Sequence, residues 1–212
     1  GSANTEPGIH SMSLQFFNTM SRQMQPFTPR EAGKAAVYTC GPTVYNYAHI
    51  GNFRAYIFED LLRRALKFCG YEVTQVMNLT DVDDKTIRDS IAAGMSLNDF
   101  TQQFKDAFFD DLDILNIEAA EEYPAATDHI PHMIELVQTL LDKEFAYVGD
   151  DGSVYYSISK FANYGKLARV DLAGQRSGAR VKSDEYGKES VADFALWKSW
   201  QESDGDVAWD SP

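Results

Sequence analysis

The stretch between residues 35 and 80 strongly limits how this chain can fold. It begins with a short apolar run, AAVYTC, whose length and β-branched and aromatic content are typical of a buried strand. A turn-rich stretch, CGPTVYNYAHIGN at 40–52, leads into a segment in which apolar residues recur at helical spacing until Gly70. The run YEVTQVMNLT then alternates apolar and polar residues as a second strand does. This order predicts a βαβ unit in a parallel sheet covered by helices.

The predicted helix after residue 51 has an apolar and a charged face. Glu59 with Arg63, and Asp60 with Arg64, form i,i+4 pairs on the charged face. Four basic residues against two acidic ones give residues 49–70 a local charge of +2, which would attract anions. The apolar positions, expected in the core, are Phe58, Leu61, Leu62, Ala65, Leu66 and Cys69.

The rest of the chain extends this α/β prediction. Helical patterns cover about 83–93, 96–115 and 128–143, and the run FAYVGDDGSVYYSI predicts a β-hairpin around Asp151 and Gly152. Residues 174–190 are polar and are expected to form a mobile loop, after which VADFALWKSW returns to an apolar pattern. No internal repeat is visible.

Composition and charge exclude several functions. The net charge of −13 argues against broad binding to nucleic acid, which needs clustered Lys and Arg, although a local site remains compatible with it. Two cysteines 29 positions apart form neither a disulfide framework nor a CxxC metal motif. Neither a run of 18 apolar residues nor a secretory signal occurs, so we expect no membrane association and a cytoplasmic protein.

The residues that end the two predicted strands are the candidate site, because ligands of open α/β sheets bind outside the carboxyl ends of the strands. Gly51 would let a phosphate approach the first turn of the helix, and His49 can donate to an anionic oxygen. A packing glycine and a histidine bonded to the loop backbone are the alternatives. Cys40 alone is more typical of a small buried hydrophobe than of a functional thiolate.

Two further clusters have simpler explanations than a metal site. Asp81, Asp83 and Asp84 could bind a divalent cation, but a helix start with acidic residues in its first turn is favoured. His129 and His132 are spaced i,i+3 without a third ligand nearby, so a helix entry beside Pro131 is favoured over zinc.

The stretch YTCGPTVYNYAHIGNFRAY, followed by VMNLTDVDDKTI, resembles the start of the catalytic domain of the cysteinyl-tRNA synthetases, a class I aminoacyl-tRNA synthetase family. FFNT, DILNIE, KEFAYV, SGARV and DFALWK also fall in that family's order, so the resemblance covers Met12 to Pro212. It implies a Rossmann-like fold. It also implies an enzyme that activates cysteine with ATP, releases pyrophosphate and transfers the cysteinyl group to the 3′ end of tRNA(Cys).

The resemblance implies roles for individual residues as well. Cys40 matches a ligand of Zn2+, which in that family binds the thiolate of the substrate cysteine. Zinc prefers a soft thiolate to a hydroxyl, so the metal would separate cysteine from serine. ATP would enter as a substrate with Mg2+. The residues that match the ATP-binding and catalytic segment are Thr43, His49, Gly51 and Asn52, and those that match the amino-acid pocket are Gly41 and Thr80.

The chain departs from the family in two ways. The family signature His-Ile-Gly-His is here His49-Ile50-Gly51-Asn52. An amide keeps an N–H donor but cannot become cationic. We therefore expect the activity to depend less on protonation at residue 52, and not to be lost. The family's other zinc ligands, its Lys-Met-Ser-Lys-Ser loop and its anticodon-binding region all lie beyond Pro212. The chain alone is therefore expected to bind zinc weakly or not at all and to be inactive.

These features suggest a division of the chain. Residues 1–11 resemble a cloning remnant, 12–120 the first half of the catalytic domain, and 121–212 a connecting insertion that leads back towards the second half. The expected partners are tRNA(Cys), cysteine and ATP, and the expected state is a monomer. Two other functions remain open. One is a cysteine ligase that joins cysteine to an amino sugar, and the other is a non-catalytic binding module derived from the synthetase fold.

Overall fold

The computed structural model describes residues 14–168 and 193–212, which divide into two compact units. The first unit contains residues up to Asp81 together with Asn98–Ala125. The second contains Val82–Leu97 and the described residues from Ala126 onwards. The predicted loop at 174–190 lies outside the described residues.

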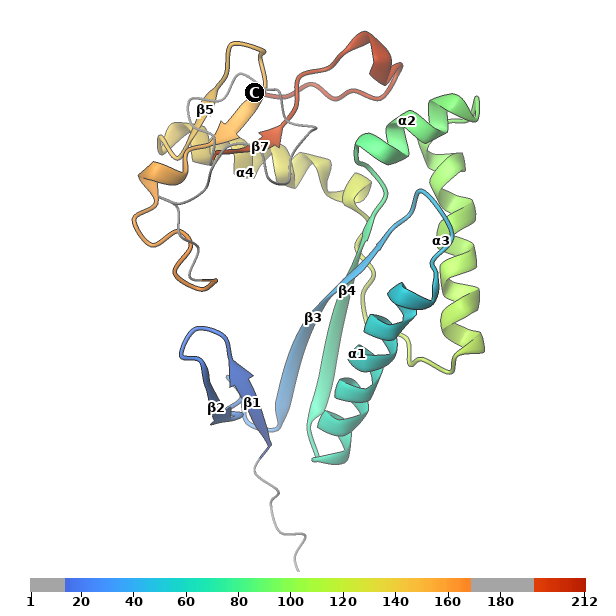
Figure 1. Cartoon of the computed structure of the whole chain (residues 1–212), viewed down its shortest axis with the longest axis vertical. Helices are drawn as coiled ribbons and strands as arrows, with labels where there is room; N and C mark the ends of the chain where they lie inside the picture. The colour runs from blue at the N-terminus through green and yellow to red at the C-terminus, as the bar shows by residue number, and fades with distance from the viewer. Residues whose placement is uncertain (1–13, 169–192) are drawn as a thin grey trace, which may run out of the picture. The chain divides into compact units, whose positions relative to one another are not determined.

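The first unit is built on the predicted βαβ arrangement. Strand β3 (Lys34–Thr43) leads to helix α1 (Ile50–Phe68) and then to β4 (Glu72–Thr80), and the two strands pair in parallel. Figure 1 shows α1 running alongside both strands. The register runs from Lys34 opposite Glu72 to Cys40 opposite Asn78. After an irregularity β3 continues beyond the predicted strand end, and Thr43 pairs with Thr80.

Residues 121–125 extend the sheet along the free edge of β4. The backbone N–H of Met77 donates to the Glu122 carbonyl at 3.0 Å, and that of Leu79 donates to the Pro124 carbonyl at 2.9 Å. The segment forms two parallel bridges with the strand, Val76 with Glu122 and Leu79 with Ala125. An N-terminal hairpin of β1 (Gln15–Asn18) and β2 (Gln23–Pro26), which the sequence did not predict, forms a separate two-stranded sheet.

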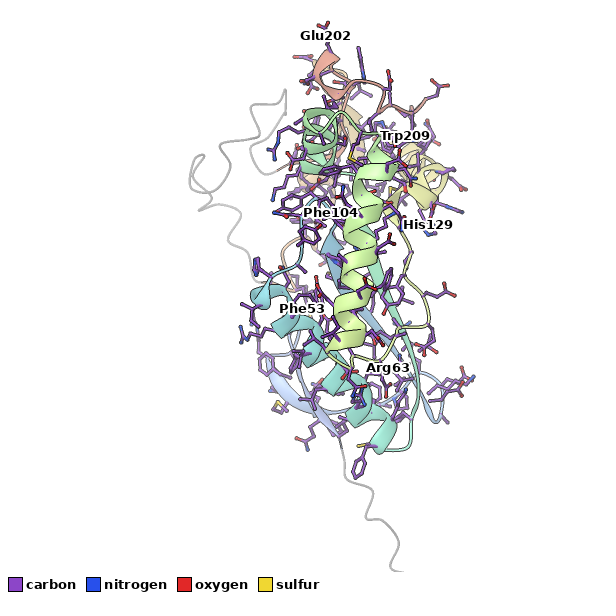
Figure 2. All side chains as sticks on the ribbon, turned by 90° about the vertical axis from the view of Figure 1, so that its right-hand side faces the viewer. Phe53, Arg63, Phe104, His129, Glu202 and Trp209 are labelled. Atoms are coloured by element: carbon purple, nitrogen blue, oxygen red, sulfur yellow. The ribbon has the colours of Figure 1, made fainter. Side chains whose placement is uncertain are left out.

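Helix α3 (Leu97–Ile114) completes the covered face of the parallel sheet. Phe53 and Tyr56 of α1 share one core with Met77 and Leu79 of β4 and with Phe108 and Leu112 of α3. Figure 2 labels Phe53 on α1 and Phe104 on α3. The buried pair Lys105–Asp81, with Nζ and Oδ2 2.6 Å apart, ties α3 to the residue that follows β4.

The predicted apolar face of α1 is partly wrong. Leu66 is buried as expected, but Phe58 and Leu61 are 65% and 62% exposed, and Cys69 is exposed as well. The apolar residues of this helix span a wider arc than the described elements of the unit cover. The arc that is covered includes Phe53 and Tyr56, which lie towards the start of the helix.

The charged face of α1 also differs from the prediction. Arg63 is buried and does not pair with Glu59; its guanidinium binds Glu121 through two hydrogen bonds of 2.8 and 2.6 Å and Glu118 through one of 3.0 Å. The predicted pair of Arg64 with Asp60 is confirmed at 2.7 Å. Lys67 also binds Glu118. Because these three basic side chains are already paired with carboxylates, the local positive charge expected to attract anions is largely neutralised.

The second unit matches the remaining sequence patterns. The predicted helices are α2 (Asp84–Ala92) and α4 (Ile130–Asp142), the latter preceded by a 3-10 turn at Ala126–His129. The predicted hairpin is β5 (Ala146–Val148) and β6 (Val154–Tyr156), which β7 (Phe194–Trp197) extends into a three-stranded antiparallel sheet. Short 3-10 turns lie at Ile158–Lys160 and Glu202–Asp204. None of the helices in the described residues is long and apolar enough to cross a bilayer.

The Arg63 cluster, which is Arg63 with Glu118 and Glu121, is expected to stabilise the fold in a way that depends on pH. Arg63→Met removes three charge-assisted hydrogen bonds from a buried guanidinium, and we expect it to lower the free energy of unfolding at pH 7 by about 2 kcal/mol. Arg54→Met is the matched control, because Arg54 is an exposed arginine of the same helix with no ion pair among residues 14–168 and 193–212. Denaturant unfolding measures both variants.

The acid dependence gives a second measure of the same cluster. Chiefly because Arg63 donates to it, the pKa of Glu121 falls to about 2. A lowered carboxyl pKa contributes stability above the unfolded-state pKa, near 4.5, and loses it as the pH falls towards 2. Arg63→Met is therefore expected to flatten the fall in stability between about pH 5 and pH 2. An unchanged acid profile would show that the cluster does not stabilise the fold.

Candidate functional site

The carboxyl end of the β3–β4 pair places the predicted strand-end residues together. Cys40 is exposed, so the reading of this thiol as a buried hydrophobe is wrong. Thr43 and Thr80 are half-buried and directly paired in the register. Cys40 pairs with Asn78, two positions before Thr80. Because side chains alternate between the faces of a strand, Asn78 and Thr80 share the face to which Cys40 belongs.

Gly41 has a packing reason to be glycine. A Cβ built at this position would lie 2.0 Å from the backbone carbonyl oxygen of Asn78 and 2.9 Å from Cγ of Met77. The bulge in β3 therefore brings its backbone against β4 more closely than any side chain allows. The close approach brings the Cys40–Thr43 segment up against the end of β4.

The loop between β3 and α1 is held by β4 and α3. The N–H of Val44 donates to the Thr80 carbonyl at 3.0 Å, and Val44 packs in a core with Phe100 and Phe104 of α3. Tyr47 makes an edge-on ring contact with Phe104, with centroids 5.1 Å apart. The loop that leads to His49 is thus fixed on both sides rather than free to move away from the strand ends.

His49 and Asn52 form a reciprocal cap at the start of α1. The Nδ1 atom of His49 accepts from the backbone N–H of Gly51 at 3.0 Å, and Oδ1 of Asn52 accepts from the backbone N–H of His49 at 3.0 Å. A Cβ at Gly51 would lie 2.8 Å from the His49 ring, so glycine allows the imidazole to fold over the helix end. The predicted set of unpaired N–H groups is reduced, because His49 takes that of Gly51.

The cap leaves hydrogen-bond donors on both side chains. With Nδ1 accepting, the neutral imidazole of His49 carries its proton on Nε2. With Oδ1 accepting, Asn52 keeps both amide protons on Nδ2. Neither donor has a further partner within the described part of the chain. Two neutral donors and the positive end of the α1 dipole form a suitable environment for an anionic ligand.

A group of polar side chains on the face of the sheet opposite α1 was missed by the sequence reasoning. The hydroxyl of Tyr38 donates to Oδ1 of Asn78 at 3.1 Å, and Nδ2 of Asn78 donates to Oγ1 of Thr80 at 3.3 Å. The period-two alternation of β4 puts residues 78 and 80 on one face, so this signal was present in the sequence.

The face of the sheet that α1 covers carries ionisable groups of its own. Burial raises the pKa of Tyr56 to about 12, with further contributions from the charges of Glu59 and Cys40, so this phenol stays neutral at physiological pH. Burial also raises the pKa of the Glu59 carboxyl, although the hydroxyl of Thr39 donates to it. Glu59 thus faces the strand rather than Arg63.

The two alternative metal clusters are explained by helix starts and ion pairs. Asp83 caps α2 by accepting from the N–H groups of Lys85 and Thr86, as the favoured prediction stated. Asp81, 1% exposed, pairs with Lys105, and Asp84 pairs with Lys198. The pair of His129 and His132 stands at the start of α4, with ring centroids 5.5 Å apart.

Zinc fits this chain only in part. Over residues 14–168 and 193–212, no three His, Cys, Asp or Glu side chains are grouped to hold a metal ion. The exposed thiol of Cys40 has the donor chemistry of one zinc ligand. The described residues thus offer one candidate ligand and not a four-coordinate site.

The two glycines predict different costs when each is given a side chain. Gly41→Ala forces the backbones of β3 and β4 apart, and we expect it to lower the free energy of unfolding by about 3 kcal/mol. Gly51→Ala displaces only the ring of His49, so we expect less than about 1 kcal/mol. Urea unfolding of both variants tests the difference. Equal losses would contradict the close approach of the two strands at Gly41.

Comparisons with known proteins identify the family to which the chain belongs. Residues 26–212 match the family model described as tRNA synthetases class I (C) catalytic domain. A cysteine--tRNA ligase of Protochlamydia amoebophila is 57% identical over 98% of this chain and 44% of its own length. One of Brachyspira hyodysenteriae is 54% identical over 94% of this chain and 42% of its own length. The chain thus spans less than half the length of the curated relatives it matches.

A solved structure supports the fold class. The crystal structure of a LeuRS–tRNA–LeuAMS ternary complex from Agrobacterium radiobacter K84 aligns with a TM-score of 0.50 and 23% identity. The alignment covers 63% of this chain and 18% of that one. At this identity the likeness concerns the fold alone, and it agrees with the predicted Rossmann-like α/β class. With a family model that matches nearly all of its length, the chain belongs to the class I (C) tRNA synthetase catalytic domain family.

Proposed function

We propose that the protein carrying this chain is a cysteine–tRNA ligase, which activates cysteine with ATP and transfers it to tRNA(Cys). The names of relatives about 50–57% identical over nearly the whole chain support this function over the amino-sugar ligase and over a non-catalytic module. Residues 12–120 would form the first half of the catalytic domain and 121–212 the connecting insertion. The protein would act as a cytoplasmic monomer.

The observation that carries the ATP site is the reciprocal cap of α1. The cap uses the acceptor atoms of His49 and Asn52 and leaves donors on Nε2 and Nδ2. In the activation step a carboxylate oxygen of the amino acid bonds to the α-phosphorus of ATP while the bond to pyrophosphate breaks. The two donors, with Thr43, would stabilise the negative charge that develops on the α-phosphate, and the missing side chain of Gly51 would let the phosphate come close to the helix start. Mg2+ would accompany ATP.

The amino acid would bind beside this cap at the strand ends. Cys40 would supply one ligand to Zn2+, whose preference for thiolates would select cysteine over serine. Gly41 and Thr80 would line the pocket, since both lie at the same end of the paired strands as Cys40. The acceptor used after activation separates the two ligase candidates: labelled cysteine should transfer to tRNA(Cys) and not to an amino sugar.

Exchange of pyrophosphate into ATP tests the two cap residues in the complete protein. We expect His49→Ala to lower the exchange rate by about 100-fold, the usual loss for one donor to a developing charge. Asn52→His should stay within about tenfold of the parent, because a neutral donor is retained. Asn46→Ala is the control, since Asn46 is exposed in the same loop and its side chain, among the described residues, bonds only the backbone of its neighbour Tyr47. An inactive parent rescued by Asn52→His would contradict the role assigned to Asn52.

Substitution of the two exposed thiols tests the zinc ligand. Cys40→Ser in the complete protein should lower bound zinc and abolish cysteine-dependent exchange, because a hydroxyl is a poor zinc ligand. Cys69→Ser is the matched control, because Cys69 is exposed at the far end of α1. Metal analysis and exchange assays measure both variants. Full zinc content in Cys40→Ser would remove Cys40 from the site.

A further inference from the structure

The face of the parallel sheet opposite α1 and α3 presents a row of polar side chains beside Cys40. On β3, Ala35 and Thr39 are buried while Tyr38 and Cys40 are exposed, and on β4 Val73, Gln75, Met77 and Leu79 are buried. Helices α1 and α3 pack on the buried side. Tyr38, Cys40, Asn78 and Thr80 therefore belong to the opposite face, at the end of the sheet where the candidate amino-acid site lies.

Three of these side chains form a continuous hydrogen-bond chain. Tyr38 donates to the amide oxygen of Asn78 at 3.1 Å, and the amide nitrogen of Asn78 donates to the hydroxyl oxygen of Thr80 at 3.3 Å. Asn78 is thus held at both ends of its amide. Because Thr80 accepts one of these bonds, its own O–H remains to donate to an acceptor group outside the chain of bonds.

The position of Tyr38 is not explained by packing. Its side chain is 66% exposed, so it buries little apolar surface, yet its hydroxyl reaches across to the neighbouring strand. An exposed hydrogen bond of this kind contributes only about 1 kcal/mol to stability. Its evident effect is to fix the orientation of Asn78, which pairs in register with Cys40.

We propose that Asn78 and Tyr38 are positioning residues that orient the hydroxyl of Thr80 for the amino-acid substrate, with Asn78 acting on Thr80 and Tyr38 acting on Asn78. This inference rests on the proposed function, because it requires an amino acid to bind beside Cys40 and Thr80. It assigns neither residue to the ATP site, which lies at the cap of α1. The predicted effect is therefore confined to the affinity for the amino acid.

Exchange kinetics in the complete protein test this assignment. Asn78→Leu should raise the KM for cysteine about tenfold, as expected when a hydroxyl loses its oriented partner, and leave the KM for ATP within about twofold. Tyr38→Phe should raise the KM for cysteine by a smaller factor, about threefold. The double variant should be no worse than Asn78→Leu alone, because Tyr38 acts through Asn78.

Two further variants keep the result interpretable. Asn78→Asp preserves the size of the side chain but removes the donor to Thr80, so it should also raise the KM for cysteine if Asn78→Leu does not fold. Thr74→Val is the matched control, because Thr74 is exposed on the same face of β4 and pairs with Ala36, away from Cys40. It should leave both constants unchanged.

The outcomes separate this inference from the function on which it rests. A parent protein without cysteine-dependent exchange would overturn the proposed function and the inference with it. An active parent whose KM for cysteine is unchanged in Asn78→Leu and Asn78→Asp would overturn the inference alone. So would equal rises in the constants for cysteine and ATP, since these would mark a general distortion of the sheet rather than a local effect on the amino-acid site.

Discussion

The parallel pairing of β3 with β4 is the constraint on which the first unit depends. It aligns residues that are 37 or 38 positions apart in the chain, so that Cys40 stands opposite Asn78 and Thr43 opposite Thr80. The absence of a side chain at Gly41 lets the bulged end of β3 approach the Asn78 carbonyl. After this close approach Thr43, a proposed ATP-binding residue, pairs with Thr80, a proposed pocket residue.

At the start of α1, His49 and Asn52 both cap the helix and keep donors for a ligand. A helix begins with backbone donors that have no partner in the helix, and here His49 and Asn52 satisfy one donor each. The atoms used are acceptors, so capping and donation to a ligand do not compete. The short amide of Asn52 reaches back to the His49 N–H through its oxygen and keeps both protons of its nitrogen for a ligand.

Much of the fold could be predicted because its signals are local. The strand, loop, helix and strand of residues 34–80, the helices at 84–92, 97–114 and 130–142, and the hairpin at 146–156 all follow from periodicity and turn residues. The wrong predictions concern side chains whose burial depends on a segment that is distant in the sequence. Arg63 is buried because Glu118 and Glu121, more than 50 residues away, accept its hydrogen bonds. Cys69 and Phe58 fit an apolar helical pattern, but their exposure depends on which arc of α1 faces the sheet. The candidate site followed from the loop sequence, whereas the link from Tyr38 through Asn78 to Thr80 required the strand register.

The Lys105–Asp81 pair has a consequence for how the first unit is assembled. The chain leaves this unit after Asp81 and returns at Asn98, and the pair joins the point of departure to the helix on which the chain returns. The two ends of residues 82–97 are therefore joined by a buried ion pair that lies within the first unit. Since closing a longer loop costs only about 0.6 kcal/mol for each doubling of its length, residues 82–97 can change in length with little effect on the parallel sheet. Variation in this segment is in this way separated from the geometry of the site.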